Sequence, residues 1–441
     1  MSVETRRAAA EALEALPPGI ETIRVTYPDL HGIQRGKDVP VAEFERVCEH
    51  GLAFCWAVMG TDLRHTPVVG GEQGYPDMVA MPDCDTLVQV PWEPDVASCL
   101  ADLRRAADGE PEPTDPRGAV RRAQAALREL GLDAVIGPEL EFFLCAPDPG
   151  RPGRWTRYVD NLSMVYTVGR QADPRGVVRA MLEGFNHMGL QTFAANHEYM
   201  NSQYEINLRH SDALDASDRA FRLKCVVKDV AATHGLLATF IGKPFNDQGG
   251  SGYHVHLSLG RDGENAFAGD EQLLRHVVGG VLAHAPALMA FLNPTINAYR
   301  RLLPDSLAPT HVNWGRDNRT TFVRIPPETG SASRLEIRVG DGSANPYLAN
   351  AATLFAALDG VRREVEPPAP LAGDAYRAEE PGSPLPQSLD DALDALEADD
   401  VICGAMGREL VETFVTMKRF ETERHRQWVS DFDLDEYLHH L

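Results

Sequence analysis

The stretch 250-GSGYHVHLSL-259 alternates polar and apolar side chains, and this pattern decides the fold. Successive side chains of a β-strand point to opposite faces. A strand here therefore has one apolar face and one polar face, the latter made by His254, His256 and Ser258. Same-face neighbours lie about 6.7 Å apart, so the two histidines are too far apart to share one metal ion but can line one pocket. Alternation is typical of any half-buried strand. This stretch therefore indicates a functional site only if other segments supply further polar side chains.

The composition is that of a globular protein. The chain has 441 residues, of which 43% are hydrophobic and 24% are charged, and this length allows two or more domains. Its net charge of −23 argues against nucleic acid or an anionic membrane surface as partner, because both require basic patches. The net charge does not exclude a small anionic substrate, because local arginines would bind it.

The sequence predicts a cytoplasmic location. No apolar run approaches the length of a membrane span. The N-terminal MSVETRRAAAEALEAL lacks the continuous apolar core of a signal peptide, and it predicts an amphipathic helix that ends at Pro17. The seven cysteines are scattered and contain no CxxC pair, which favours reduced thiols over disulfides or a zinc site.

Two stretches rich in proline, glycine and acid divide the chain. The first, 108-DGEPEPTDP-116, predicts a linker between an N-terminal domain (1–107) and a catalytic domain (117–441). The second, 366–388, predicts a surface excursion before a helical C-terminal region.

The periodicity of the chain predicts an α+β fold. Irregular connections between the strands favour an antiparallel-rich sheet over a doubly wound one. Besides the leading helix, the expected helices cover 41–50, 117–132, 174–189, 215–234 and most of 389–441. The expected strands cover 22–29, 86–92, 133–145, 202–208, 236–241, 253–259, 320–325 and 334–339.

The alternation of the first stretch recurs in other predicted strands, with carboxylates in place of histidines. Glu139 and Glu141 share a face, Glu205 lies on the polar face of 202–208, and Glu336 lies between two arginines. Burying such rows is costly unless the charges are paired or bind metal. They therefore predict one sheet whose apolar face lies on the core and whose charged face lines a cavity. Carboxylates with one or two imidazoles suit Mg²⁺ or Mn²⁺ better than zinc.

Arginines accompany these acids. Guanidinium groups bind carboxylates and phosphates in a bidentate manner, and a divalent cation with several arginines indicates a nucleoside triphosphate. The chain has no G-x-x-x-x-G-K-[ST], so a P-loop is not indicated. Any single one of these glutamates fits an ordinary salt bridge equally well, and only the whole set favours catalysis. The arginines are Arg301, Arg319, Arg324, Arg334 and Arg338.

Together these segments resemble the glutamine synthetase family of the bacterial class I type, and most of all its glutamate–amine ligases, which make γ-glutamyl derivatives of polyamines, ethanolamine or alkylamines. The resemblance implies a small N-terminal β-grasp domain followed by a catalytic domain with a curved, antiparallel-rich sheet flanked by helices. The matching segments are 138-PELEFF-143, 197-HEYMNSQYEIN-207, 250-GSGYHVHLSL-259, 293-NPTINAYRRL-302, 318-NRTTFVRIP-326, 334-RLEIR-338 and 343-SANPYLANAATL-354.

The resemblance also implies a role for each residue. One Mg²⁺ or Mn²⁺ ion would be held by Glu141, Glu198 and Glu205, and a second ion by Glu139, His254 and Glu336. ATP would contact His256, Ser258 and Arg334, while glutamate would contact Arg301, Arg338 and the backbone at Gly250. Arg319 and Arg324 would stabilise the transferring phosphoryl group, and Glu198 also belongs to the implied catalytic set.

The family reaction has two steps. ATP phosphorylates the γ-carboxylate of glutamate, and an amine then displaces phosphate from the acyl phosphate. The resemblance further implies a homododecamer of two stacked hexameric rings, with each active site shared between neighbouring subunits.

Two departures from the family pattern concern the nucleophile. Where the family has the acid of P-G-Y-E-A-P, this chain has Leu307 in 304-PDSLAP-309. Where the family has the aspartate of F-D-G-S-S, it has Cys55 and Trp56 in 54-FCWAVMG-60. An ammonium ion requires charged or polar partners, so these residues predict a pocket for the hydrocarbon part of an organic amine. Asp305 and Asp62 are candidates for its charge.

Alternative interpretations remain open. The chain could be a glutamine synthetase with an altered ammonia site, or an inactive relative that acts as a regulator, although all six implied metal ligands are present. Tyr376, in the 366–388 excursion, is a candidate for regulatory modification. The sequence does not identify the amine.

Overall fold

The computed structural model describes residues 3–160 and 164–441. Residues 1 and 2, the first two of the predicted leading helix and N-terminal domain, lie outside the described residues. The rest of that helix is present as α1 (Val3–Glu14).

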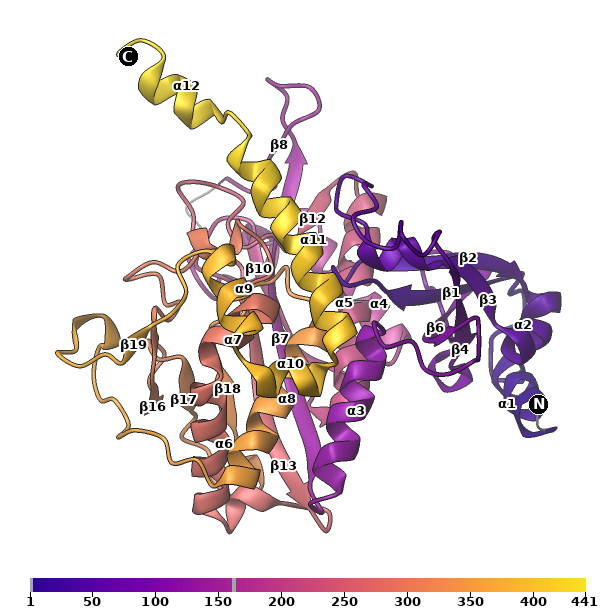
Figure 1. Cartoon of the computed structure of the whole chain (residues 1–441). Helices are drawn as coiled ribbons and strands as arrows, with labels where there is room; N and C mark the ends of the chain where they lie inside the picture. The colour runs from indigo at the N-terminus through magenta and orange to yellow at the C-terminus, as the bar shows by residue number, and fades with distance from the viewer. Residues whose placement is uncertain (1–2, 161–163) are drawn as a thin grey trace.

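The N-terminal part forms a six-stranded sheet at one side of the molecule (Figure 1). The strand order is β2-β1-β6-β4-β3, with β5 also paired to β6. Strand β1 pairs antiparallel with β2 and parallel with β6. These strands are β1 (Thr22–Pro28), β2 (Gln34–Pro40), β3 (Leu52–Cys55), β4 (Asp77–Pro82), β5 (Val88–Gln89) and β6 (Val96–Arg105), and α2 (Phe44–His50) lies between β2 and β3.

One predicted strand of this part is mostly wrong. Of residues 86–92, only Val88–Gln89 pair as a strand, and a 3-10 turn at Cys84–Thr86 precedes them. The Thr86 hydroxyl donates to the carbonyl of Asp83 and accepts from the amide of Leu100, which holds the turn. Pro91 has no N–H to donate to a sheet, so the strand ends early.

The large sheet carries the candidate site. Its order is β16-β17-β18-β13-β7-β10-β9, with four short strands attached to β7 or β13. All of its pairs are antiparallel except β16 with β17, which confirms the predicted antiparallel-rich α+β fold. The strands are β7 (Asp133–Pro147), β8 (Trp155–Arg157), β9 (Thr192–His197), β10 (Gln203–Leu208), β11 (Ser211–Asp212), β12 (Leu237–Thr239), β13 (Tyr253–Arg261), β14 (Glu264–Asn265), β16 (Trp314–Arg316), β17 (Val323–Ile325) and β18 (Leu335–Ile337), while β15 (His311–Val312) and β19 (Ser383–Pro384) form a separate pair.

Helices pack beside the large sheet and the C-terminal helix projects from the body (Figure 1). Helices α3 and α5 pack against β7. The helices are α3 (Pro116–Arg128), α4 (Val177–His187), α5 (Ala213–Thr233), α6 (Glu271–Ala283), α7 (Ala285–Leu292), α8 (Pro346–Arg363), α9 (Leu389–Glu397), α10 (Asp400–Met406), α11 (Arg408–Arg426) and α12 (Asp431–Tyr437).

Helices α6, α7 and α8 were not predicted from the sequence. The side chains of α7 and most of those of α8 are buried, so these two helices lack the single apolar stripe that marks a helix at the surface. Helix α6 is buried from Val277 to Leu282 and exposed at both ends. Among the described residues, no single helix is long and apolar enough to cross a bilayer. Only α6 and α7 together pass such a test, and they are bent by 73°.

Strand β13, formed by the first stretch, lies between β7 and β18. His254 is opposite Glu139 on β7, and His256 is opposite Glu336 on β18. The residues of the other face, Tyr253, Val255, Leu257 and Leu259, are all fully buried. The predicted division into an apolar and a polar face is confirmed.

A buried arginine joins the N-terminal sheet to the large one. Arg117, on α3, is 1% exposed and donates to Asp218 on α5 at 2.9 and 2.8 Å. The same guanidinium reaches Asp102 on β6 at 2.6 Å and Asp83 at 2.7 Å. Arg121, one turn later and 44% exposed, contacts Asp83 and Asp102 as well.

We expect Arg117→Leu to destabilise the protein by about 3–5 kcal/mol, because it leaves buried Asp218 with the hydrogen bond from Tyr347 but without the guanidinium paired to it. Arg121→Leu is the matched control and should cost about 1 kcal/mol or less, because exposed ion pairs contribute little. Urea denaturation followed by tryptophan fluorescence measures both. Equal shifts of the two midpoints would show that burial does not decide the strength of this junction.

Candidate active site

Strands β7, β10, β13 and β18 present their ionisable side chains on one face of the large sheet. The register places Glu205 opposite Glu141 and Asn207 opposite Glu139. Leu140 and Phe142, which alternate with these glutamates, are fully buried on the other face. The alternation that buries the core therefore concentrates the acids in one place.

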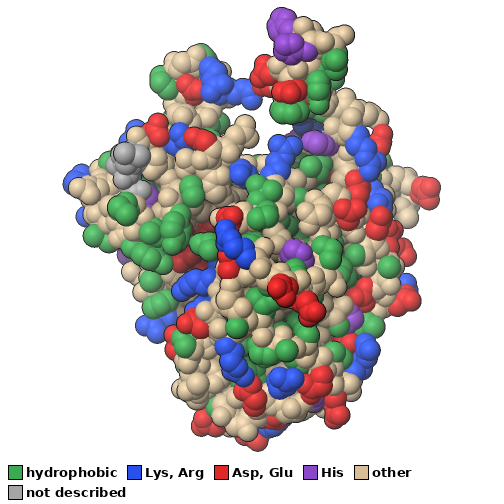
Figure 2. All heavy atoms as spheres, turned by 90° about the vertical axis from the view of Figure 1, so that its left-hand side faces the viewer, with side chains coloured by type: hydrophobic (Ala, Val, Ile, Leu, Met, Phe, Trp, Pro, Cys, Tyr) green, Lys and Arg blue, Asp and Glu red, His purple; other side chains and the backbone are tan. Residues whose placement is uncertain are grey.

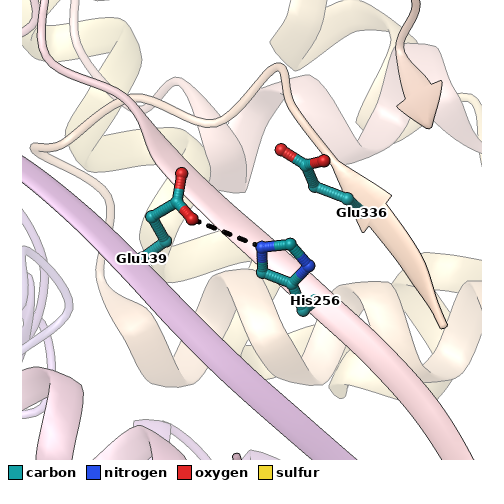
Figure 3. A group of neighbouring side chains, drawn as sticks. All are labelled: Glu139, His256 and Glu336. Atoms are coloured by element: carbon teal, nitrogen blue, oxygen red, sulfur yellow. Dashed lines mark hydrogen bonds and ion pairs between the residues drawn. The ribbon is translucent and has the colours of Figure 1, made fainter. Parts of the chain in front are cut away.

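Two groups of three side chains on this face could each hold a metal ion. The first is Glu139, Glu205 and His254, and the second is Glu139, His256 and Glu336, with ligand atoms within 4.8 Å of one another in each group. Figure 3 shows the second group, with His256 between the two carboxylates. Glu139 belongs to both groups: one carboxylate oxygen lies 2.7 Å from His254 Nδ1 and the other lies 3.4 Å from His256 Nε2.

This grouping differs from the one that the resemblance implied. His256, expected at ATP, joins Glu139 and Glu336, while Glu205 joins Glu139 and His254. Glu141 and Glu198 accept hydrogen bonds from protein groups instead. Glu141 accepts from the Gln203 amide at 2.9 Å and from the amide of Gly252 at 2.8 Å, and Glu198 accepts from Asn196 at 2.6 Å. Their roles as metal ligands stay predictions.

Crowding of the acids changes their ionisation. Burial, together with the negative charges of Glu139 and Glu141, raises the pKa of Glu205 to about 10. Burial, together with the charge of Glu141, raises the pKa of Glu198 to about 7. Like charges in a poorly solvated place cannot all be ionised, so this part of the site requires either protons or a cation.

Glu139 and Glu336 behave in the opposite way. Burial alone would raise the pKa of Glu139, but hydrogen bonds with His254 and His256 outweigh it and hold that pKa well below its usual value. Burial is likewise outweighed at Glu336, where Arg338 and the two histidines lower the pKa to about 2. Two carboxyl groups and one imidazole in each group fit a hard divalent cation such as Mg²⁺ or Mn²⁺, which in the first group would displace the proton of Glu205.

Arginines flank Glu336. Arg324 donates to one of its oxygens at 2.7 Å, and Arg338 donates to the other. Arg324 also bonds Asp317 at 2.7 Å. Arg319, in contrast, is exposed, and its guanidinium forms no ion pair with the residues that the structure describes. The structure thus brings Arg324 and Arg338 together at the second group of ligands.

A cavity of about 490 Å³ adjoins this group. The residues predicted to face ATP, His256, Ser258 and Arg334, all line it, and Arg334 Nε lies 3.3 Å from His256 Nδ1. Glu139, Glu336, Arg319 and Arg324 line it too. Phe193, His210 and Asn265 also line it and were not predicted from the sequence. Phe193 lies on β9, a strand that the sequence did not predict, and it is 66% exposed.

The two arginines predicted to contact glutamate are buried. Arg301 and Arg338 are 6% and 5% exposed, and Arg301 donates to the carbonyl of Val339 at 3.0 Å. A Cβ on Gly250 would lie 2.3 Å from the carbonyl oxygen of Gly242 and 2.7 Å from Arg301 Cγ. A Cβ on Gly252 would lie 2.9 Å from His254 Nε2. The glycines are therefore required for backbone to approach these side chains closely.

The described part of a single chain does not bring the predicted amine-pocket residues together. Leu307 is 41% exposed on the 304–309 loop. Trp56 belongs to the N-terminal part, where its indole N–H donates to Glu112 at 3.1 Å, and neighbouring Cys55 is exposed.

The two acids considered for the charge of the amine are both engaged. Asp62 is 1% exposed, accepts from the amides of Arg64 and Thr66 at 2.8 Å, and pairs with Arg424. Asp305 pairs with Arg377 at 3.1 Å. Asp62 is thereby part of the internal structure of the chain.

Charges on one face of the outer surface, seen in Figure 2, are mixed. Acidic and basic side chains are interspersed over the face shown in Figure 2, with no continuous basic area on it. The concentration of like charge that marks the strand face is not repeated there.

Comparison with known proteins identifies relatives over nearly the whole chain. Residues 113–437 match the family model described as the catalytic domain of glutamine synthetase. A glutamine synthetase of Pyrococcus horikoshii is 37% identical over 93% of this chain and 91% of its own length, and one of Thermotoga maritima is 35% identical over the full length of both chains. A solved structure of a GmaS/ADP complex superposes with a TM-score of 0.86 and 33% identity, covering 98% of this chain and 99% of that one. GmaS without ligand gives a TM-score of 0.85 at 34% identity, with the same coverage.

We expect Glu139→Gln to weaken Mn²⁺ binding at both groups, by about 100-fold or more, because this carboxylate is common to them and a ligand matters at least as much as its supporting residues. Glu328→Gln is the matched control: Glu328 lines the same cavity but is exposed and pairs with Arg334. Isothermal titration with Mn²⁺ measures both variants. Unchanged affinity in Glu139→Gln would contradict the shared ligand.

We also expect the affinity for Mn²⁺ to rise with pH between 6 and 8. Glu198 and Glu205 have raised pKa values of about 7 and about 10, so they carry protons at low pH that a cation must displace. The same shifts destabilise the ion-free fold as pH rises above about 4.3, the unfolded pKa of glutamate, so stabilisation by metal should be greater at pH 8 than at pH 6. Titration in buffers of different ionisation enthalpy counts the protons released. A pH-independent affinity contradicts this expectation.

Proposed function

The chain belongs to the glutamine synthetase family, and from this premise we propose that it joins L-glutamate to an organic amine, forming a γ-glutamyl amide through γ-glutamyl phosphate. Enzymes of this family are ATP-dependent C–N ligases that use ATP and divalent metal ions. The amine is the part of the proposal that distinguishes this chain within its family.

The arginines and acids around the strand face support the first step. Arg301 and Arg338 would bind the carboxylates of glutamate in a fixed position, which favours attack of the γ-carboxylate on the terminal phosphorus of ATP. Arg319 and Arg324 would neutralise charge on the transferring phosphoryl group. The two ligand groups at Glu139 would hold Mg²⁺ or Mn²⁺, which supplies positive charge to the phosphate oxygens when bound.

The proposal of an organic amine in place of ammonia rests on one observation, the residues of the 304–309 loop. The family acid that meets ammonium is replaced by Leu307, which is apolar and 41% exposed. The nearest acid in sequence, Asp305, is paired with Arg377. An ammonium ion would find little compensation for its lost hydration here, whereas the hydrocarbon part of an amine would gain from contact with leucine. The likeness to GmaS, a γ-glutamylmethylamide synthetase, supports the same choice.

A second candidate is the use of ammonia. It is favoured by the relatives at 35–37% identity that are named glutamine synthetase. The two functions share the first step and differ only in the nucleophile, so the strand face does not separate them.

We infer in addition that the site is completed by a neighbouring copy in a homododecamer of two stacked hexameric rings. The separation of Trp56 and Cys55 from Leu307 in one chain supports this assembly. We also propose that the chain is divided into an N-terminal domain (1–107), a linker (108–116) and a catalytic domain (117–441).

We expect at least one organic amine to give a higher kcat/KM than ammonium. The assay uses the full chain with ATP, Mg²⁺ and L-glutamate, and it follows phosphate release with ammonium or with alkylamines, ethanolamine, polyamines and aromatic amines. In Leu307→Glu, the preference should shift toward ammonium by about tenfold, equivalent to about 1.4 kcal/mol, because a carboxylate can then bind the small cation.

Leu303→Glu is the matched control, because Leu303 lies at the start of the same loop and is 47% exposed. The preference of Leu303→Glu for organic amines over ammonium should equal that of the parent enzyme. Better turnover with ammonium than with every amine would favour the second candidate, and equal effects of the two variants would remove Leu307 from the choice of nucleophile.

A further inference from the structure

The 304–309 loop has a strained backbone. Asp305 and Leu307 have φ angles of +62° and +59°. Residues other than glycine, asparagine and aspartate rarely adopt this left-handed region. Such a conformation persists only when the surrounding structure holds it. Leu307 is largely exposed, so burial of its own side chain does not supply the force. The loop must be held by its neighbours.

Tyr376 supplies the most buried of these contacts. Its hydroxyl donates to the carbonyl of Ala308 at 2.8 Å, and Ala308 is 1% exposed. A second contact, between Arg377 and Asp305, joins side chains that are both about two-thirds exposed, and such pairs contribute little. From inside the loop, the Ser306 hydroxyl donates to the carbonyl of Arg301 at 3.1 Å. The tyrosine is thus the principal external support of the loop.

The turn that carries Tyr376 is itself anchored to the arginine segment. The amide of Ala375 donates to Thr320 Oγ1 at 3.0 Å, and the Asn318 side chain donates to the carbonyl of Gly373 at 2.7 Å. These two anchors stand on either side of Arg319. The loop, the turn and the phosphate-facing arginine therefore form one connected unit.

Tyr376 is joined to Arg301 through the loop, because the loop accepts its hydrogen bond at Ala308 and donates from Ser306 to the carbonyl of Arg301. Burial raises the pKa of its phenol, and the positive charges of Arg301 and Arg338 partly oppose this. The ring is half-buried, and its hydroxyl points to the backbone of the loop at Ala308. Its hydroxyl is already bonded, which makes a structural role a better fit than the exposed modification site considered from the sequence.

We propose that Tyr376 is a positioning residue that fixes the 304–309 loop beside the acyl phosphate and so keeps water from it until an amine arrives. This rests on the proposed function, in which γ-glutamyl phosphate is the intermediate. In the side reaction, water adds to the γ-carbonyl carbon, the bond from that carbon to the phosphate oxygen breaks, and glutamate and inorganic phosphate leave. The net result is hydrolysis of ATP to ADP and phosphate without an amide.

The variant Tyr376→Phe removes only the hydroxyl that holds Ala308. We expect phosphate release from ATP and glutamate without an acceptor to rise about fivefold, and kcat/KM for the acceptor to fall by a similar factor, with KM for ATP unchanged. Arg377→Ala should change both by less than twofold. Hydrogen exchange of the amides of 303–309 should quicken in Tyr376→Phe whatever acceptor the enzyme uses.

Tyr299→Phe is the matched control, because the buried Tyr299 hydroxyl has no hydrogen-bond partner among the described residues. It should change neither phosphate release nor exchange of the loop. The proposal is overturned if Tyr376→Phe and Tyr299→Phe behave alike in both measurements. Failure of the proposed function has a different result: the parent enzyme itself releases no glutamate-dependent phosphate with any acceptor, while exchange of the loop still reports whether Tyr376 holds it.

Discussion

The structure depends on one electrostatic constraint, the burial of several carboxylates on a single face of one sheet. Charges in a poorly solvated place must be paired, protonated or bound to metal. Glu139 and Glu336 meet this demand with histidines and arginines, and their pKa values are lowered. Glu205 meets it with a proton, and its pKa is raised. The same face thus contains ionised carboxylates beside a neutral acid whose proton a cation would displace, an arrangement that suits a divalent metal ion.

Position in the fold separates the general chemistry from the choice of substrate. The groups that would meet metal and phosphate stand on paired strands, whose register is held by backbone hydrogen bonds. The residues that would meet the nucleophile lie on the 304–309 loop and in the N-terminal part. Strands hold a constellation more tightly than loops do, and loops tolerate change more readily. A family can therefore keep the phosphoryl chemistry while its acceptor changes.

Much of the architecture was predictable because half-buried strands show an alternation of polar and apolar residues in the sequence. The rows in β7, β10, β13 and β18 alternate with period two, and the structure confirms each of them. Helices α6, α7 and α8 were not predicted, and for α7 and α8 the reason is that a helix buried on nearly every side has no polar face to reveal its period. Residues 86–92 were wrong as a strand because a side-chain hydrogen bond of Thr86 favours a turn there. Local pattern is informative only where one side of an element faces water.

The sequence by itself determined which side chains would share a face, and hence that carboxylates, histidines and arginines would meet. This follows from the two-residue period of a strand, which needs no knowledge of the neighbours. Only the tertiary structure decided the neighbours: that Glu139 lies within reach of both candidate groups, that His256 lies in one of them, and that Tyr376 bonds to Ala308. These pairings depend on strand register and on loops that meet across long stretches of chain, and a shift of one residue would turn every side chain to the other face.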